Sequence, residues 1–381
     1  MSEKIPKGWK WVKLGDEIEL LYGKGLTEKE RKNGIYPVYG SSGIIGYHNN
    51  YLVKGPGVII GRKGSVGEVN LSKTDFYPID TTYYLKLKND NDIFFFYYLL
   101  KTLRLNEINS HSAVPGLSRE DIYSLYIPLP PLPEQKAIAE VLSSIDDKIE
   151  LLHRQNKTLE KMAMTLFRQW FIEPTRDGLP EGWEEVSLGD IFDIGIGRTP
   201  PRKESQWFSV NQHDIRWISV KDLGSIDTYI LNSSEFLKEE SVKEFNIPII
   251  PDNTVVLSFK LTVGRIGITI GEMVSNEAIA HFKPKPDSKI SSNYLYLFLK
   301  TLDFSTFGST SSIAEAINSK IIKEIKIHVP DDELITSFQS LINPVFQKIR
   351  LNTLEIQTLE KLRDTLLPKL MSGEAKIMNN E

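Results

Sequence analysis

Residues 61–67 (GRKGSVG) place two basic side chains and a hydroxyl among glycines. Arg62 and Lys63 carry the charges, and Ser65 carries the hydroxyl. Such a loop can contact a nucleic-acid backbone, because lysine and arginine neutralise phosphates and a serine hydroxyl donates to their oxygens. The stretch lacks the GxxxxGK[ST] spacing of a nucleotide-binding loop, so a nucleotide site is not predicted. A tight, solvated hairpin is the alternative interpretation.

A later stretch, residues 259–265 (FKLTVGR), repeats this chemistry with fewer glycines. It keeps basic and hydroxyl residues at Lys260, Thr262 and Arg265. Two loops of the same chemistry in one chain favour contact with a DNA backbone over a single nucleotide site.

Two other glycine-rich stretches lie at residues 40–48 and 195–200. Glycine lets a backbone approach a ligand closely, but it serves ordinary turns equally well, and a turn is the simpler interpretation. If these stretches do contact DNA, the candidate side chains are Tyr47, Arg198 and Thr199.

Composition excludes several classes of function. The 381 residues are enough for two or three domains, and 40% hydrophobic with 25% charged residues is typical of globular proteins. The absence of cysteine excludes thiol catalysis, cysteine-ligated zinc and disulfides, and makes a cytoplasmic location the default expectation. No apolar run reaches the roughly 18 residues of a membrane span. The formal net charge of -4 argues against a globally basic DNA binder but says nothing about local patches.

No catalytic motif is found in the sequence. The GxSxG, HExxH and strand-to-helix GxGxxG patterns are absent. The six histidines are scattered without a pair at ligand spacing, so neither a metal site nor a bound cofactor is predicted in this chain.

The elements that position these loops occur twice. Residues 6–16 (PKGWKWVKLGD) return as residues 180–190 (PEGWEEVSLGD), an offset of 174. The offset rises to 197 at the two basic loops and settles at 200 near the end, so most of the extra length lies between residues 190 and 255. Ordered matches with a slowly drifting offset predict two copies of one unit.

A long helix is predicted over residues 133–172, because apolar residues recur there every seven positions in two columns that form a coiled-coil seam. The columns are Ile138, Ile145, Leu152, Leu159 and Leu166, and Leu142, Ile149, Ala163 and Trp170. Asn156 interrupts the second column. At ~1.5 Å per residue this rod is roughly 60 Å long, enough to hold two domains apart.

The repeat predicts a second such helix near the end of the chain, with Asn352 and Arg363 in its seam. Antiparallel helices with Asn156 opposite Asn352 would bring apolar residues together and let the two amides bond to each other. A parallel arrangement would leave both amides unpaired, at about 1 to 3 kcal/mol each. We therefore expect antiparallel helices. In this register Arg363 lies near Ile145, with its charged head in water.

One contact of this register depends on Pro344, because an interior proline kinks or ends a helix. If the second helix continues through Pro344, Trp170 lies against Phe338.

The globular parts are predicted to be of the α+β class. In the first, residues 58–60, 83–87 and 123–127 have the character of strands, and residues 92–105 that of a helix. The expected organisation is a first domain over 1–132, a spacer helix over 133–172, a linker over 173–182, a second domain over 183–330, and a C-terminal helix and tail over 331–381.

Four motifs mark the limits of these units. They are GW and LGD within residues 8–16, IPLPPLPEQK at 127–136, the second GW and LGD within 182–190, and LRDTLLPKLMSGE at 362–374. In this order they resemble the specificity subunits of Type I restriction-modification systems, over nearly the whole chain. The second helix departs from the pattern, since VPDDEL at residues 329–334 replaces the proline-rich entry.

The resemblance implies a non-catalytic DNA reader with a pseudo-two-fold internal repeat. Each globular part would be a target-recognition domain that reads half of a bipartite site, with the two halves roughly one helical turn apart. The two antiparallel helices would set the spacing and dock two methyltransferase subunits and the restriction subunits. S-adenosylmethionine, ATP and magnesium would belong to those partners. The two domains differ widely in sequence, so the half-sites should differ too.

Two other classes of function stay open at this stage. A fused methyltransferase or nuclease would methylate or cut DNA by itself, and the missing motifs disfavour it. A coiled-coil scaffold with two protein-binding heads would explain the repeat and the negative charge, and would be indifferent to DNA.

Overall fold

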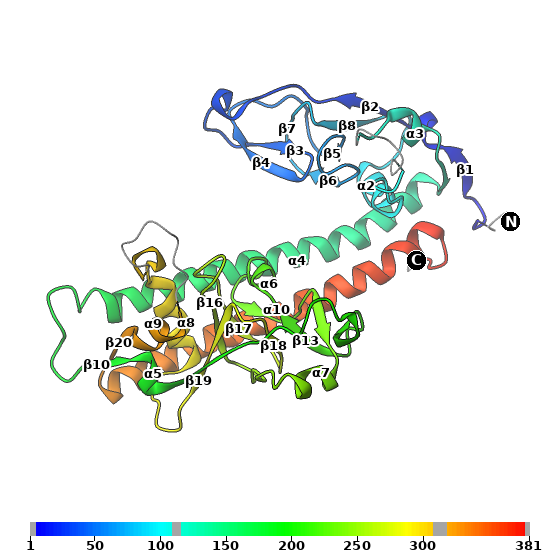
Figure 1. Ribbon diagram of the computed structural model, residues 1–381. Coiled ribbons are helices and arrows are strands. Elements are labelled where there is room, and N and C mark those ends of the chain that lie inside the picture. The colour runs from blue at the N-terminus through cyan, green and yellow to red at the C-terminus, as the bar shows by residue number, and fades with distance from the viewer. Residues whose placement is uncertain (1–4, 109–115, 308–317, 378–381) are drawn as a thin grey trace. The chain divides into compact units, whose positions relative to one another are not determined.

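The computed structural model describes residues 5–108, 116–307 and 318–377. The chain divides into two compact units, residues 1–149 with 358–381 and residues 150–357. Two long helices, α4 (Leu132–Phe167) and α10 (Asp332–Ser372), each contribute residues to both units (Figure 1). In the described ranges, no helix combines the length and apolarity needed to cross a membrane.

The globular part of the first unit contains a four-stranded sheet, ordered β2-β8-β5-β6, a three-stranded sheet, ordered β4-β3-β7, and the separate pair β1-β9. The strands are β1 (Lys10–Lys13), β2 (Ile18–Tyr22), β3 (Tyr36–Gly40), β4 (Gly43–His48), β5 (Gly57–Gly61), β6 (Val69–Ser72), β7 (Tyr77–Pro78), β8 (Thr82–Leu87) and β9 (Tyr126–Leu129). The helices are α1 (Leu14–Glu17), η1 (Glu28–Glu30), α2 (Ile93–Thr102) and α3 (Arg119–Tyr123).

The local sequence explains the elements of the first unit that matter for its core. Strand β5 reads GVIIG and is buried along its whole length, as a strand covered on both faces must be. Helix α2 begins where Asp92 accepts a hydrogen bond from the Phe95 N–H at 2.8 Å. The strand predicted from Tyr123 is wrong at its start, because Ser118 caps a short helix that runs through Tyr123.

The second unit repeats this plan with additions, a five-stranded sheet ordered β11-β19-β16-β17-β14, a four-stranded sheet ordered β12-β15-β13-β18, and the pair β10-β20. The strands are β10 (Glu184–Ser187), β11 (Phe192–Ile196), β12 (Phe208–Ser209), β13 (Ile215–Ile218), β14 (Tyr229–Ile230), β15 (Glu235–Leu237), β16 (Val255–Ser258), β17 (Ile266–Thr269), β18 (Val274–Ser275), β19 (Ile279–Pro284) and β20 (Lys326–Val329). The helices are α5 (Leu188–Ile191), η3 (Ser205–Trp207), α6 (Val220–Leu223), α7 (Glu239–Glu244), α8 (Ser292–Thr301), η4 (Phe304–Phe307) and α9 (Ser319–Glu324).

The internal repeat extends to strand register. Lys10 pairs with Leu129 at one end of β1-β9, and their repeat counterparts Glu184 and Val329 pair in β10-β20. The extra residues between 190 and 255 add strands β12 and β14 and helices α6 and α7. The insertion therefore enlarges the second domain without changing the repeated frame.

The two long helices run antiparallel within each unit. In the second unit, Asn156 contacts Asn352 and, farther along α4, Phe167 lies 5.9 Å from Phe338 between ring centres. Helix α10 passes through Pro344 without a break. As the register requires, the rings of Trp170 and Phe338 lie 5.7 Å apart, Trp170 being part of a π-helical extension of α4, η2 (Arg168–Ile172).

One detail of the predicted register is wrong. The head of Arg363 does not extend into water but donates from Nη1 to Oδ1 of Asp146 at 2.9 Å. Asp146 also accepts a hydrogen bond from the Tyr98 hydroxyl at 2.7 Å. Asp146 thus accepts hydrogen bonds from both Arg363 and Tyr98. A charge-assisted hydrogen bond to this half-buried carboxylate stabilises the arginine head more than contact with water would.

Candidate nucleic-acid interface

The first basic loop connects β5 to β6 and is held in place by backbone hydrogen bonds. The N–H of Arg62 donates to the carbonyl of Thr81 at 2.9 Å, and the N–H of Gly67 closes the loop onto Gly61 at 2.8 Å. Lys63 and Ser65 are exposed at its tip. A loop with a fixed backbone and exposed polar side chains is suited to contact the phosphate backbone of DNA.

The second basic loop, between β16 and β17, has the same hydrogen-bond pattern. The N–H of Phe259 donates to Ala278 at 2.9 Å, and the N–H of Gly264 closes the loop onto Ser258 at 3.0 Å. These bonds match those of the first loop at an offset of 197 in both donor and acceptor. The loops at residues 61–67 and 259–265 are thus equivalent parts of the repeat although their sequences differ.

The side chains of the second loop are only partly free. Thr262 is exposed, and Lys260 is half-buried with Nζ 5.4 Å from the centre of the Phe259 ring. Arg265 donates from Nη1 to the carbonyl of Val220 at 2.6 Å and so ties the loop to α6. Its counterpart in the first loop is acidic, Glu68, so this position does not keep its charge between the repeats.

The two glycine-rich stretches are not equivalent to each other. Most of residues 40–48 is strand β4, where Tyr47 is exposed. Arg198 follows β11 and donates to the carbonyl of Phe245 at 3.0 Å, while the Thr199 hydroxyl donates to the Glu277 carboxylate. Tyr47 belongs to the first unit, whereas Arg198 and Thr199 belong to the second.

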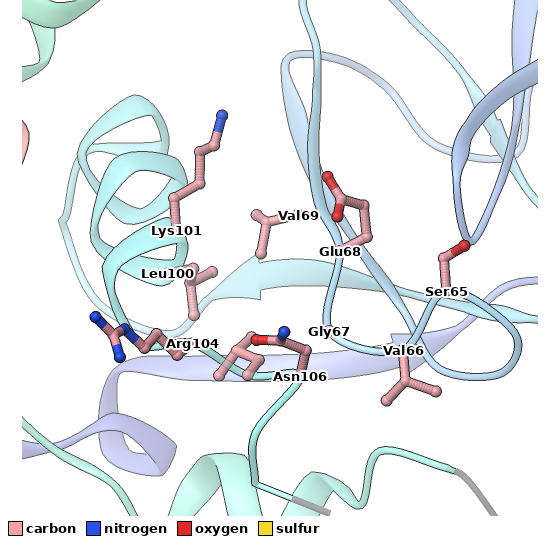
Figure 2. Close-up of a pocket in the computed structure, with 10 residues that line it drawn as sticks. Ser65, Val66, Gly67, Glu68, Val69, Leu100, Lys101, Arg104 and Asn106 are labelled. Atoms are coloured by element: carbon pink, nitrogen blue, oxygen red, sulfur yellow. The ribbon is translucent and has the colours of Figure 1, made fainter. Parts of the chain in front are cut away.

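A hollow of about 280 Å³ lies beside the first basic loop. Figure 2 shows the segment from Ser65 to Val69 on one side and the end of α2, with Lys101 and Arg104, on the other. Both basic side chains are exposed. Basic side chains therefore continue from the loop to the end of α2 and the residues just after it, where Glu68 also lines the hollow and Glu107 lies 3.6 Å from Arg104.

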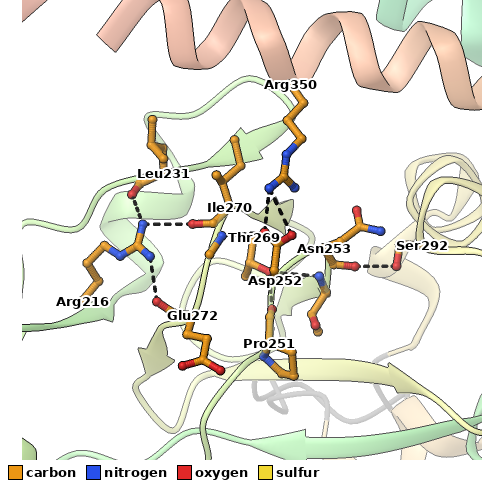
Figure 3. A network of polar contacts seen from close by, with 12 residues as sticks. Arg216, Leu231, Pro251, Asp252, Asn253, Thr269, Ile270, Glu272, Ser292 and Arg350 are labelled. Carbon is orange, nitrogen blue, oxygen red and sulfur yellow. Dashed lines mark hydrogen bonds and ion pairs between the residues drawn. The ribbon is translucent and has the colours of Figure 1, made fainter. Parts of the chain in front are cut away.

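A polar network attaches the second domain to α10 (Figure 3). Arg350 of α10 lies 2.8 Å from Oδ1 and 3.0 Å from Oδ2 of Asp252. The N–H of Gly271 donates to the same carboxylate at 2.6 Å. Arg216 holds the turn around Gly271 by donating to the carbonyls of Leu231, Ile270 and Glu272. The network joins the helix to the loops that precede β16 and follow β17.

A family comparison decides the class of the protein. The model described as "Type I restriction modification DNA specificity domain" matches residues 6–161 and again residues 180–362. The chain belongs to this Type I DNA specificity family. Each of the two matches covers one copy of the internal repeat.

Relatives support this placement. The chain is 27% identical to the Type I restriction enzyme MjaIX specificity subunit of Methanocaldococcus jannaschii, over 98% of this chain and 95% of that protein. It is 24% identical to the HindI specificity subunit of Haemophilus influenzae, over 68% and 71% respectively. The solved S subunit of a Type I restriction-modification system from M. genitalium shares the fold, with a TM-score of 0.63 at 19% identity, over 99% of this chain and 98% of that one.

The structure of this Type I specificity chain adds residues that the sequence alone did not single out. Lys24 is the repeat counterpart of Arg198: the N–H of Lys24 donates to Pro78 at 3.0 Å, and that of Arg198 to Ser275 at 2.9 Å. The sequence offset of 174, which relates the early parts of the two repeats, was the signal that would have identified Lys24 as this counterpart.

Within residues 5–108, 116–307 and 318–377, no group of three or more His, Asp or Glu side chains could hold a metal ion; His111 lies outside these ranges.

Proposed function

We propose that this chain is the DNA-reading subunit of a Type I restriction-modification complex, with each globular domain reading one half of a bipartite site. The observation that carries the proposal is the equivalence of the two basic loops. Each has a backbone fixed by the same hydrogen bonds, and each carries a lysine and a hydroxyl residue at matching positions. Lys63, Ser65 and Thr262 are exposed, and Lys260 is half-buried. Contacts of this kind position a protein on double-stranded DNA, whatever the sequence.

We propose further that the chain is not itself an enzyme. Methylation and cleavage would be carried out by two methyltransferase subunits and by restriction subunits, which would bind S-adenosylmethionine, ATP and magnesium. The lack of hydrolase, metalloprotease and dinucleotide-binding motifs in the sequence supports this division of labour. A cytoplasmic location follows from the proposed ligand, the DNA of the cell.

The long helices supply a surface on which the methyltransferase could dock. Leu151 of α4 and Leu351 of α10 have 40% and 53% of their surface exposed. An open groove of about 510 Å³ lies between the helices, lined by Leu151 and Leu159 and by Arg154, Gln155, Thr158 and Lys348. Apolar surface of this kind on a long helix favours a partner helix.

The helices would also set the distance between half-sites. Inserting one heptad after Leu152 and another before Ile356 keeps the antiparallel seam in register and adds about 10 Å to the rod. That length corresponds to about three base pairs, at ~3.4 Å each. We expect the gap to grow by about that amount while both half-sites keep their sequences.

Co-expression with the partner methyltransferase, followed by mapping of modified bases in the host genome, tests the proposal. A reader of this type gives methylation at one bipartite sequence with unlike halves. A scaffold with two protein-binding heads would leave methylation unaffected by its presence. Methylation by the isolated chain with S-adenosylmethionine would instead show an enzyme.

A further inference from the structure

Two arginine side chains stack on one tyrosine ring in the first globular domain. Cζ of Arg119 lies 4.7 Å from the centre of the Tyr22 ring, and Cζ of Arg62 lies 5.1 Å from it. Arg62 is also 5.8 Å from the centre of the Tyr83 ring. Tyr22 is 49% exposed, so the stack lies at the surface. Guanidinium groups at this distance from a ring are attracted to its face.

Both arginines are held by neutral acceptors. Arg62 donates from Nη2 to the carbonyl of Asp80 at 2.8 Å, and Arg119 donates from Nη1 to the carbonyl of Leu20 at 3.3 Å. Across the described ranges of the chain, no carboxylate forms an ion pair with either guanidinium. Each guanidinium has five N–H donors, so most of them remain available to a ligand. Two like charges on one ring repel each other, and an electron-rich ligand would relieve that repulsion.

The second domain provides an internal comparison. Tyr22 pairs with Tyr83 between β2 and β8, and at the same place Ile196 pairs with Ala280 between β11 and β19. The remaining counterparts follow from the matched loops and helix starts: Phe259 replaces Arg62, and Ser319 replaces Arg119 as the first residue after a helix cap. The repeated fold thus forms without any of these charges or tyrosines. The stack therefore serves a role that only the first domain has.

We propose, on the basis of the proposed function, that Arg119 reads a guanine in the first half-site, with Tyr22 and Arg62 as its positioning residues. Phosphate contacts are needed by both domains and fit the shared lysines, Lys63 and Lys260. A contact made by one domain alone distinguishes the half-sites. Arginine donating to O6 and N7 of guanine is the commonest base-specific contact in the major groove.

The geometry assigns different tasks to the two arginines. Arg62 contacts two rings and forms the shorter hydrogen bond, and its Nε is buried, so it is fixed in place. Arg119 contacts one ring and has the longer bond to Leu20. Arg119 is thus the arginine that can turn toward a base while its plane stays supported by the ring of Tyr22.

The test uses the full chain co-expressed with its partner methyltransferase, with modified bases mapped in host genomic DNA. Arg119→Ser installs the residue that the second domain uses, and Arg119→Lys keeps the charge but cannot form the two-pronged contact. Both variants should lose discrimination at one G·C position of the first half-site, by about tenfold or more. The second half-site should stay unchanged. Arg31→Ser, which removes an arginine that donates to the Ile45 carbonyl at 2.8 Å, is the matched control and should leave that position unaltered.

Several outcomes would overturn the proposal. Retention of full discrimination by Arg119→Lys, or a uniform loss of methylation at all sites, would assign Arg119 to a phosphate. An unchanged first half-site in Arg119→Ser would overturn the base contact, and a lowered thermal unfolding midpoint in the same variant would show that the stack is purely structural. Absence of a bipartite site in the wild-type complex would instead contradict the proposed function, so the two failures are distinguishable.

Discussion

Asn352 donates a hydrogen bond from Nδ2 to Oδ1 of Asn156 at 2.8 Å, across the seam between α10 and α4. Both side chains are buried, at 0% and 2% exposure. The Oδ1 of Asn352 has no hydrogen-bond partner within the described residues. A polar layer of this kind lowers stability but fixes the register of two helices, because any shift would leave each amide against apolar side chains.

This layer predicts opposite effects for single and double substitutions. Asn352→Leu removes the donor and leaves the Asn156 amide buried without a partner, which should lower the free energy of unfolding by about 1 to 3 kcal/mol. Asn156→Leu combined with Asn352→Leu removes both amides and should restore or exceed wild-type stability. Urea denaturation midpoints measure both effects. A double variant less stable than the single one would contradict the account.

The ion pair between Asp252 and Arg350 predicts a pH-dependent attachment of the second domain to α10. Burial favours the neutral carboxyl, but the Gly271 N–H and the Arg350 guanidinium outweigh it and hold the pKa of Asp252 below its usual value. The stabilisation is therefore present at neutral pH and is lost as the pH falls through that lowered pKa.

Asp252→Asn should accordingly cost about 1 kcal/mol near neutral pH, since the pair is partly exposed, and almost nothing in strong acid. Thermal unfolding across the pH range measures the difference between wild type and variant. Asp177→Asn, at an exposed aspartate of the linker, is the control. A difference that does not shrink in acid would rule out the ion pair as the cause.

The two loop lysines predict equivalent effects on DNA affinity. If each contacts a phosphate, Lys63→Ala and Lys260→Ala should each reduce the slope of log K against log salt by about 0.9, without changing the sequence read. Titration of the methyltransferase complex with duplex DNA at several salt concentrations gives the slope. Lys136→Ala, at an exposed lysine on α4, serves as the control. Unchanged slopes would show that the loops are only tight, solvated turns.

His281 predicts acid sensitivity of the second domain. Its ring is fully buried, with Nε2 2.6 Å from the Ser275 hydroxyl. Burial, aided by Lys283, lowers the pKa of His281 to about 3. The unfolded chain therefore binds the proton more readily, and stability should fall as the pH drops from about 6.5 toward about 3. In denaturation experiments, the stability of His281→Gln should fall less than that of the wild type over this pH range. An equal fall in stability in the variant and the wild type would refute the role of His281.

Much of the frame was predictable from spacing alone. Seven-residue periodicity located the long helices and their antiparallel register, because the spacing of apolar residues along the sequence determines a coiled-coil seam. The drifting offset revealed the repeat and placed the insertion before β16. The helices, the repeat and the insertion all depend on the order and spacing of residues along the chain, and both can be read from the sequence.

The stack in the first domain shows what spacing could not reveal. Tyr22, Arg62 and Arg119 lie far apart in the sequence and meet only because β2, the β5–β6 loop and α3 converge. Pairing between distant strands depends on packing that no local pattern encodes. The partner of Arg363 was missed for a similar reason, since Asp146 lies on the other long helix.

Exchange of one reader tests the central claim most directly. Residues 16–116 would be replaced by the equivalent segment of another specificity subunit, and the methyltransferase complex would be used to map modified bases in host DNA. Two independent readers predict that one half-site changes to that of the donor while the other half-site and the gap stay as they were. A single exchange that altered both half-sites, or neither, would contradict the account.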